Sequence, residues 1–264
     1  MQRQLSLFLV AVQFLTRIRV PFLDEFEPHW LSQSARYFPL VGALVGWVSV
    51  GVWWLSSHYF PPAVAVGVMI SAAVLLTGAF HEDGFADVCD GFGGGSTRDA
   101  VLAIMKDSRV GTYGVIGVAL MLGLKWTALT AMPRAAFPAV VIGASMVSRW
   151  SATALIWRMR YVRDQPNAKS KPLADSLGTM DWLVSGALGA IALVPLVFLV
   201  DLTANLPWWR AFWTAVAIAC AATLFAAVYF ARRIGGYTGD CLGAVQQMTE
   251  LGIMLAALGT LALR

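Results

Sequence analysis

One polar stretch, HEDGFADVCDGFGGGSTRDAVLAIMKDSRVG at residues 81–111, interrupts a chain that is otherwise strongly apolar. It contains six of the protein's fifteen carboxylates. Three of them, Asp83, Asp87 and Asp90, are spaced by four and three residues, which places them on one face of a helix, within about 60° of each other. Like charges on one helix face repel, and carboxylate oxygens are ligands that suit Mg²⁺. The stretch therefore predicts a helix that carries a metal site.

The rest of the chain has the composition of a membrane protein. Of its 264 residues, 58% are hydrophobic and only 13% are charged, whereas soluble proteins average about 25% charged residues. The mean hydropathy is +0.68, and apolar runs of about 20 residues recur, each long enough to cross a bilayer as a helix. We therefore expect an all-α fold, a polytopic integral membrane helical bundle that forms a single domain over residues 1–264.

About seven transmembrane spans can be drawn, joined alternately by short turns and by long polar loops. The N-terminal segment, residues 1–36, has an apolar core too short to span and lacks a signal-peptidase cleavage site, so we expect an interfacial helix there. The long loops are residues 81–111, 158–181 and 232–248. The predicted spans are residues 37–59, 62–80, 112–132, 136–157, 182–201, 209–231 and 249–263.

The distribution of basic residues predicts the orientation in the membrane. The three long loops and the N-terminal segment together carry 14 of the 19 Lys and Arg residues, while the opposite turns carry only Arg134 and Arg210. Cytoplasmic loops of membrane proteins are enriched in basic residues. We therefore expect the acidic stretch on the cytoplasmic side. The net charge of +4 is explained by this topology and does not indicate nucleic-acid binding.

Glycines follow the acidic helix face, and residues 91–95 read GFGGG. A helix end needs one glycine, so the others suggest a turn whose backbone N–H groups approach an anion closely. Gly93, Gly94 and Gly95 are therefore candidates for phosphate binding, and Ser96 or Thr97 then opens a second short helix whose N-terminus favours an anion.

That second helix is expected to end in a charged segment with Lys106, Asp107 and Arg109. The two cations can neutralise phosphate charge, although the basic bias of cytoplasmic loops is an equally good reason for them. Asp107 opposes the helix dipole at this position and has no evident structural role, so we expect a metal ligand or a general base. We assign catalysis to Asp107 and Asp83, and metal binding to Asp83, Asp87, Asp90 and Asp107.

Charged residues also occur within the predicted spans. Lys125 and Arg149 should face the bundle interior or a wet cavity, because a charge that faces lipid costs several kcal/mol. Arg149 is expected to bind substrate, whereas a structural pairing explains Lys125 equally well. Asp240, in the third long loop, is also expected to bind substrate, because the loops are predicted to meet over one site. Glu82 lies about 100° from the acidic face and could support the metal site from outside its ligand set.

Two other functions fit parts of this pattern. Asp87, Asp90 and Gly91 match the opening of the Asp-x-x-Asp-Gly-x-x-Ala-Arg motif of CDP-alcohol phosphotransferases, but Gly94 and Gly95 occupy the Ala-Arg positions. A cation transporter could use the acidic cluster, yet transporters place their ion sites near the bilayer midplane, often at broken helices. Here the carboxylates are expected outside the membrane.

Five blocks of the chain resemble the cobalamin synthase family, the adenosylcobinamide-GDP ribazoletransferases. The block around the acidic face and the MKDSRVGTYG block are the most specific. The blocks are FPLVGALVG (38–46), TGAFHEDGFADVCDG (77–91), MKDSRVGTYG (105–114), VSRWSATALIWR (147–158) and GGYTGDCLGA (235–244).

The resemblance implies an Mg²⁺-dependent multi-pass enzyme of the bacterial cytoplasmic (inner) membrane that acts late in coenzyme B12 assembly. It would join adenosylcobinamide-GDP to α-ribazole or its 5′-phosphate, with release of GMP, and form adenosylcobalamin or its 5′-phosphate. Its partners would be these two small-molecule substrates and the lipid bilayer, without nucleic acid, and a homo-oligomer is compatible with the sequence.

Overall fold

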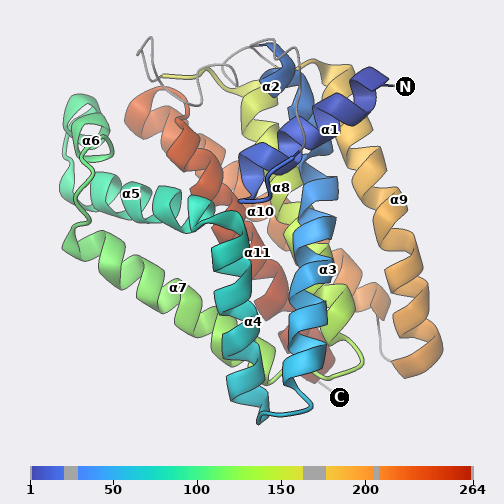
Figure 1. Ribbon diagram of the computed structural model, residues 1–264. Helices are drawn as coiled ribbons and strands as arrows, with labels where there is room; N and C mark the ends of the chain where they lie inside the picture. Colours follow the sequence, from blue (N-terminus) through green and yellow to red (C-terminus); the bar gives the residue numbers. More distant parts are fainter. Residues whose placement is uncertain (1, 21–28, 163–176, 205–207, 263–264) are drawn as a thin grey trace.

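The computed structural model is a bundle of long helices, crossed at one end by shorter ones (Figure 1). It describes residues 2–20, 29–162, 177–204 and 208–262, and within these ranges the side chains of residues 2, 192–204, 208 and 262 are not described. Most of the second predicted long loop, residues 163–176, therefore lies outside the described residues.

All seven predicted spans are helical. Among the described residues, five helices are long and apolar enough to cross a membrane, or six if the bent pair α4 and α5 counts as one broken span. The predicted polytopic helical membrane fold is confirmed. The helices that correspond to the seven predicted spans are α3 (Phe38–Ser56), α4 (Pro62–Thr77), α7 (Thr112–Thr130), α8 (Phe137–Arg158), α9 (Thr179–Ala204), α10 (Trp208–Ile234) and α11 (Gly239–Ala262).

Prolines mark the start of three of these helices, α3, α4 and α8. The first N–H groups of a helix have no partner within it, so a proline there loses no hydrogen bond, and its fixed φ suits the helix. The predicted span starts, residues 62 and 136, agree closely with the observed starts of α4 and α8.

The second predicted span does not run straight into the acidic stretch. α4 ends at Thr77, and α5 (Phe80–Gly94) begins after a bend of 89°. Gly78 and Ala79 form this elbow with left-handed φ values of 67° and 57°. Glycine adopts that conformation freely, whereas a residue with a Cβ loses about 1–2 kcal/mol. The sequence predicts that the helix of the second span runs on into the acidic stretch. That prediction was wrong, because two successive left-handed residues redirect the chain.

Beyond the elbow, α5 lies across the bundle instead of along it, and α6 (Arg98–Ile104) and the oblique helix α7 follow (Figure 1). Glycines allow α5 to cross α11 at close range. A Cβ atom at Gly84 would lie 2.9 Å from the Asp240 carbonyl oxygen, and one at Gly243 would lie 3.0 Å from the His81 carbonyl oxygen. The two backbones therefore touch, as small residues permit in membrane helix packing.

The third predicted long loop, residues 232–248, is mostly helical. α10 continues to Ile234 and α11 starts at Gly239, so only residues 235–238 connect them. Tyr237 holds this connection, because its N–H donates to the Arg160 carbonyl and its own carbonyl accepts the Val162 N–H. The prediction failed because the first turns of α11 carry polar residues that the bundle buries, such as Gln247.

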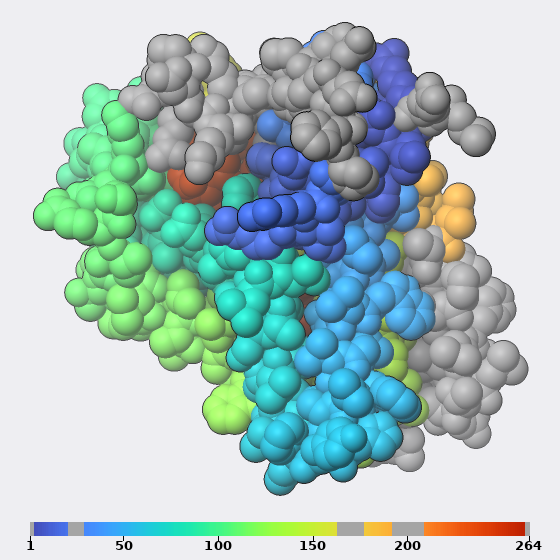
Figure 2. Space-filling view, in the orientation of Figure 1, coloured from blue at the N-terminus to red at the C-terminus, as the bar shows by residue number. Residues whose placement is uncertain are grey.

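The N-terminal segment lies across the same end of the bundle as α5. α1 (Gln2–Leu15) has 14 residues, too few to span a bilayer, and it rests over α3 and α4 (Figure 2). Among its described side chains, the five buried ones are all apolar: Leu7, Val10, Ala11, Val12 and Leu15. A short apolar helix is confirmed here, and its position at the membrane interface stays a prediction. A short helix, α2 (His29–Ser34), and a 3₁₀ turn then lead into α3.

Candidate functional site

The three aspartates of α5 differ in their exposure to solvent. Asp83 is exposed, Asp87 is half-buried and Asp90 is 8% exposed. Within the described ranges, no group of three or more His, Cys, Asp or Glu side chains is arranged to hold a metal ion. The four predicted ligands are therefore not preassembled, and Mg²⁺ binding stays a prediction.

Asp90 caps the N-terminus of α7. Its carboxylate accepts the backbone N–H of Gly111 at 2.7 Å and that of Gly114 at 2.8 Å. These N–H groups have no partner within α7, and the partial positive charge of a helix N-terminus favours an anion. The repulsion along α5 is thus partly offset without a metal, whereas the sequence alone suggests only a bound cation.

Asp107 pairs with Arg109 in the segment between α6 and α7. Its carboxylate accepts the Arg109 backbone N–H at 3.0 Å and the guanidinium at a shortest distance of 2.6 Å. These bonds lower the pKa of Asp107 to about 2. A carboxylate with that pKa accepts protons weakly near neutral pH. Asp107 therefore has a structural partner that sequence analysis did not foresee, and the reason for making it a general base is lost.

The predicted glycine turn is not formed. Gly91 to Gly94 belong to the last turn of α5, and the Gly95 N–H donates to the Gly91 carbonyl at 2.9 Å. The missing side chains instead let α6 approach α5, since Met105 fills the space beside Gly91. The prediction of a turn was wrong because glycine's small size, and not its conformational freedom, is used here. Gly93 and Gly94 are exposed, and their contact with substrate stays a prediction.

The start of the second short helix agrees with its prediction, because the Thr97 hydroxyl accepts the Ala100 N–H and caps α6. α6 ends at Ile104, so Lys106 and Arg109 lie in the following segment, and both are exposed. They flank Asp107 as cations available to an anionic ligand, and the Arg109 guanidinium is shared with that carboxylate.

Of the remaining candidates, the structure brings Asp240 to α5 and places Arg149 elsewhere. Asp240 lies in the first turn of α11, where its backbone packs against Gly84. Arg149 is 3% exposed within the bundle, and its guanidinium donates to the carbonyl and the hydroxyl of Ser145, at 2.8 Å each. Arg149 is thus not on the exposed acidic face.

A buried polar cavity of about 60 Å³ lies beneath the elbow, and sequence reasoning did not assemble it. Ionisable side chains from four helices line it: His81 and Glu82 of α5, Lys125 of α7, Arg149 of α8 and Glu250 of α11. The expectation that Lys125 and Arg149 face the bundle interior is confirmed. The sequence did contain one indication of this cavity. Each cation inside a span needs a partner, so acids in neighbouring spans should face it.

A chain of hydrogen bonds connects the groups around this cavity. Lys125 Nζ donates to Gln247 Oε1 and to Glu250 Oε2, and Gln247 Nε2 donates to Glu82 Oε1 at 2.9 Å. Arg149 lies 4.0 Å from Glu250. Two cations thus face two carboxylates, so the bundle interior carries little net charge at this point.

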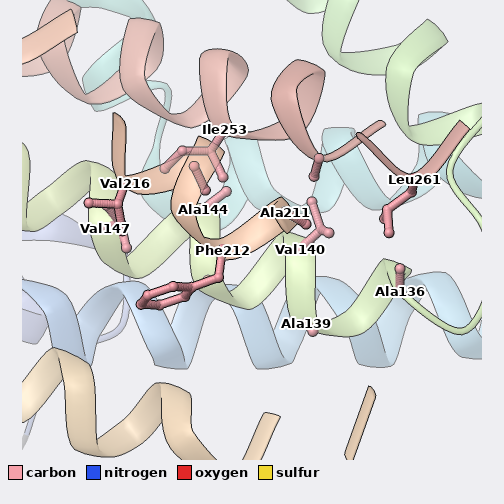
Figure 3. Close-up of a pocket in the computed structure, with 13 residues that line it drawn as sticks. Ala136, Ala139, Val140, Ala144, Val147, Ala211, Phe212, Val216, Ile253 and Leu261 are labelled. Atoms are coloured by element: carbon pink, nitrogen blue, oxygen red, sulfur yellow. The ribbon is translucent and has the colours of Figure 1, made fainter. Parts of the chain in front are cut away.

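A larger cavity, of about 120 Å³, lies between α8, α10 and α11. Figure 3 shows Phe212, Ile253 and Val147 among the side chains that line it. All of the lining residues are apolar, so the cavity offers no charged group to a phosphate or a metal. We therefore place the candidate site at α5 and not here.

The sequence matches the family model for cobalamin-5-phosphate synthase over residues 7–258. The chain belongs to the cobalamin-5-phosphate synthase family. The match includes α5, α7, α8 and all of α11 except its last four residues, so the residues of the candidate site lie within the matched region. The resemblance seen in the sequence blocks is confirmed.

Relatives named adenosylcobinamide-GDP ribazoletransferase are similar over nearly their whole length. The protein of Leptothrix cholodnii is 42% identical over 94% of this chain and 93% of its own. That of Shewanella sp. strain ANA-3 is 42% identical over 94% and 92%, and that of Shewanella frigidimarina is 40% identical over 97% and 95%. No solved structure matches this member of the cobalamin-5-phosphate synthase family.

Proposed function

We propose that this protein is an adenosylcobinamide-GDP ribazoletransferase of the bacterial cytoplasmic membrane. The observation that carries the proposal is the family match over residues 7–258, supported by relatives of that name at 40–42% identity. The reaction transfers the phosphocobinamide group of adenosylcobinamide-GDP to α-ribazole or its 5′-phosphate. The products are GMP and adenosylcobalamin or its 5′-phosphate.

In this reaction a ribose hydroxyl oxygen attacks the phosphorus atom that bears cobinamide. The bond from that phosphorus to the GMP oxygen breaks, and the hydroxyl proton is released. When bound, Mg²⁺ supplies positive charge that stabilises the diphosphate and the departing GMP. Positioning and charge neutralisation are therefore what the protein has to provide.

The donor set on α5 fits this ion. Asp83 is exposed and Asp87 is half-buried, and both offer hard carboxylate oxygens. Each Asp90 oxygen accepts one backbone N–H and retains a further lone pair. We propose that Asp83 and Asp87 hold Mg²⁺, with Asp90 beside them. Lys106 and Arg109 follow the acidic helix in the sequence, and both are exposed. They would bind the diphosphate.

The test uses detergent-purified protein supplied with adenosylcobinamide-GDP, α-ribazole and Mg²⁺, with GMP and the corrinoid product measured together. We expect both products in equal amounts, and chelation of Mg²⁺ should abolish both. Asp83→Asn and Asp87→Asn should each lower kcat by roughly 100-fold or more, because each removes a charge from the metal site.

Asp99→Asn is the matched control for these variants. Asp99 is an exposed acid in the neighbouring helix α6, where it forms an ion pair with the exposed Arg98. Its loss should leave kcat close to that of wild type. Failure of wild-type protein to form GMP would contradict the proposed reaction, whereas wild-type rates in Asp83→Asn and Asp87→Asn would contradict only the metal assignment.

A further inference from the structure

We propose that Glu82, Gln247 and Lys125 form a positioning network for the phosphoryl-transfer site, because they fix the rotation of α5 about its own axis. The inference rests on the proposed function. It concerns Glu82, about 100° around α5 from Asp83, and its partners on α11 and α7, and none of them would touch the substrate.

The elbow leaves the rotation of α5 to its contacts with other helices. In a continuous helix, hydrogen bonds between successive turns transmit any twist, but α4 and α5 are separated by the two left-handed residues Gly78 and Ala79. The direction and rotation of α5 must therefore be set by its contacts with other helices. At the elbow end of α5, the hydrogen bond from Gln247 to Glu82 makes such a contact.

Glu82 is the direct sequence neighbour of Asp83, about 100° from it around the helix. A rotation of α5 that moves Glu82 must move Asp83 by the same angle, and Asp87 with it. Because Glu82 lines the buried cavity while Asp83 is exposed, a bond at Glu82 holds the acid face toward solvent.

The hydrogen-bond network that holds Glu82 is buried, and the donor and acceptor of each bond are defined. Gln247 is 2% exposed and Lys125 is 6% exposed. The ammonium group of Lys125 can only donate hydrogen bonds, so the amide oxygen of Gln247 is the atom that accepts from it. The amide nitrogen of Gln247 therefore faces Glu82 and donates to it. Glu250 holds the same ammonium from α11. The spanning helices α7 and α11 therefore fix the amide that binds α5.

Two atoms of charged side chains at the cavity have no protein partner among the described residues, Glu82 Oε2 and Arg149 Nε. One is an acceptor and the other a donor, and the cavity of about 60 Å³ has room for water, which can serve both. Water would complete the network on the second Glu82 oxygen, so both oxygens of the carboxylate would be fixed.

The first test compares two variants at Glu82. Glu82→Gln keeps an oxygen that accepts the Gln247 N–H, so kcat should stay within about threefold of wild type. Glu82→Leu removes the acceptor at similar size, and kcat should fall by about 10- to 100-fold, as when a supporting residue of a metal site is lost. The Mg²⁺ concentration for half-maximal activity should rise, while the KM for α-ribazole should not change.

The second test exchanges the two partners. Gln247→Glu alone places a carboxylate opposite Glu82, and the rate should fall as for Glu82→Leu. The double variant Glu82→Gln with Gln247→Glu restores one amide and one carboxylate, with the amide on α5 as donor. It should recover most of the wild-type kcat and the wild-type Mg²⁺ dependence. A merely structural loss would lower the yield or the melting temperature without this selective recovery.

Asp181→Asn serves as the control, because it breaks the 2.9 Å ion pair with Arg36, which joins the 3₁₀ turn to α9 and has no link to α5. It should affect stability and leave kcat per folded molecule unchanged. Wild-type kcat and Mg²⁺ dependence in Glu82→Leu, or a double variant no better than Gln247→Glu alone, would overturn the network. Absence of GMP from wild-type protein would instead overturn the proposed function.

Discussion

Four aspartates that look alike in the sequence have different surroundings in the folded chain. Asp90 accepts two backbone N–H groups at the start of α7, and Asp107 is paired with Arg109. On the acidic face of α5, Asp83 is exposed and Asp87 is half-buried. Charge and spacing therefore identify the acidic face, but the partner of each carboxylate decides how much of its charge remains for a ligand.

The pairing of Asp107 gives a pH prediction. Arg109→Gln removes the guanidinium donors, so the pKa of Asp107 should rise from about 2 toward the ordinary value near 3.9. The pairing stabilises the fold above the unfolded pKa, and its contribution is lost as the pH falls through about 2. Nuclear magnetic resonance titration of protein with ¹³C-labelled Asp side chains measures the shift, with Asp107→Asn to assign the signal. An unchanged titration in Arg109→Gln would show that the guanidinium is not what lowers this pKa.

Among the elements, the elbow between α4 and α5 has the greatest effect on the site. Gly78→Ala should destabilise the protein by about 2 kcal/mol, because φ is 67° there and the Arg17 side chain occupies the space of a Cβ. Ala79→Gly should be neutral or slightly stabilising, because it relieves the same strain at φ 57°. Thermal unfolding in detergent measures both changes.

Gly51→Ala in α3 is the control for the elbow variants, since a Cβ at Gly51 would meet no atom within 4 Å. It should leave the melting temperature unchanged or raise it slightly, because alanine favours the helix. If Gly78→Ala changes the melting temperature no more than Gly51→Ala does, the left-handed conformation at the elbow does not disfavour a residue with a Cβ.

Comparison of the elements also indicates what the sequence could predict. Span positions followed from apolar length alone, and the predicted starts of α4 and α8 agree closely with the observed ones, where a proline lies in the first turn. The elbow could not be predicted, because Gly78 and Ala79 are compatible with a membrane helix until tertiary contacts redirect it. The first turns of α11 were missed because Gln247 is polar in the sequence, yet α5 and α7 supply its partners. These partners lie more than 100 residues from Gln247 in the sequence, so local patterns do not reveal them.

For the whole molecule, the prediction concerns orientation. α1, α5 and α6 gather at one end of the bundle, and the last turn of α11 lies at the other (Figure 1). With Cys89, Cys220 and Cys241 replaced, a single cysteine at Ser96 should react with an impermeant maleimide only after the cells are permeabilised. One at Tyr59, exposed in the turn between α3 and α4, should react in intact cells. The opposite pattern would reverse the topology.

The length of α4 links the site to the lipid around it. Its 16 residues extend about 24 Å, whereas the hydrocarbon core of a bilayer is about 30 Å thick. In a bilayer of that thickness, this hydrophobic mismatch would draw α5 below the headgroup plane or thin the bilayer around it. Lipids with shorter acyl chains would bring the acidic face of α5 closer to water, and lipids with longer chains would place it deeper in the bilayer. The composition of the surrounding membrane would therefore act as a regulator of catalysis, without any ligand binding to the protein.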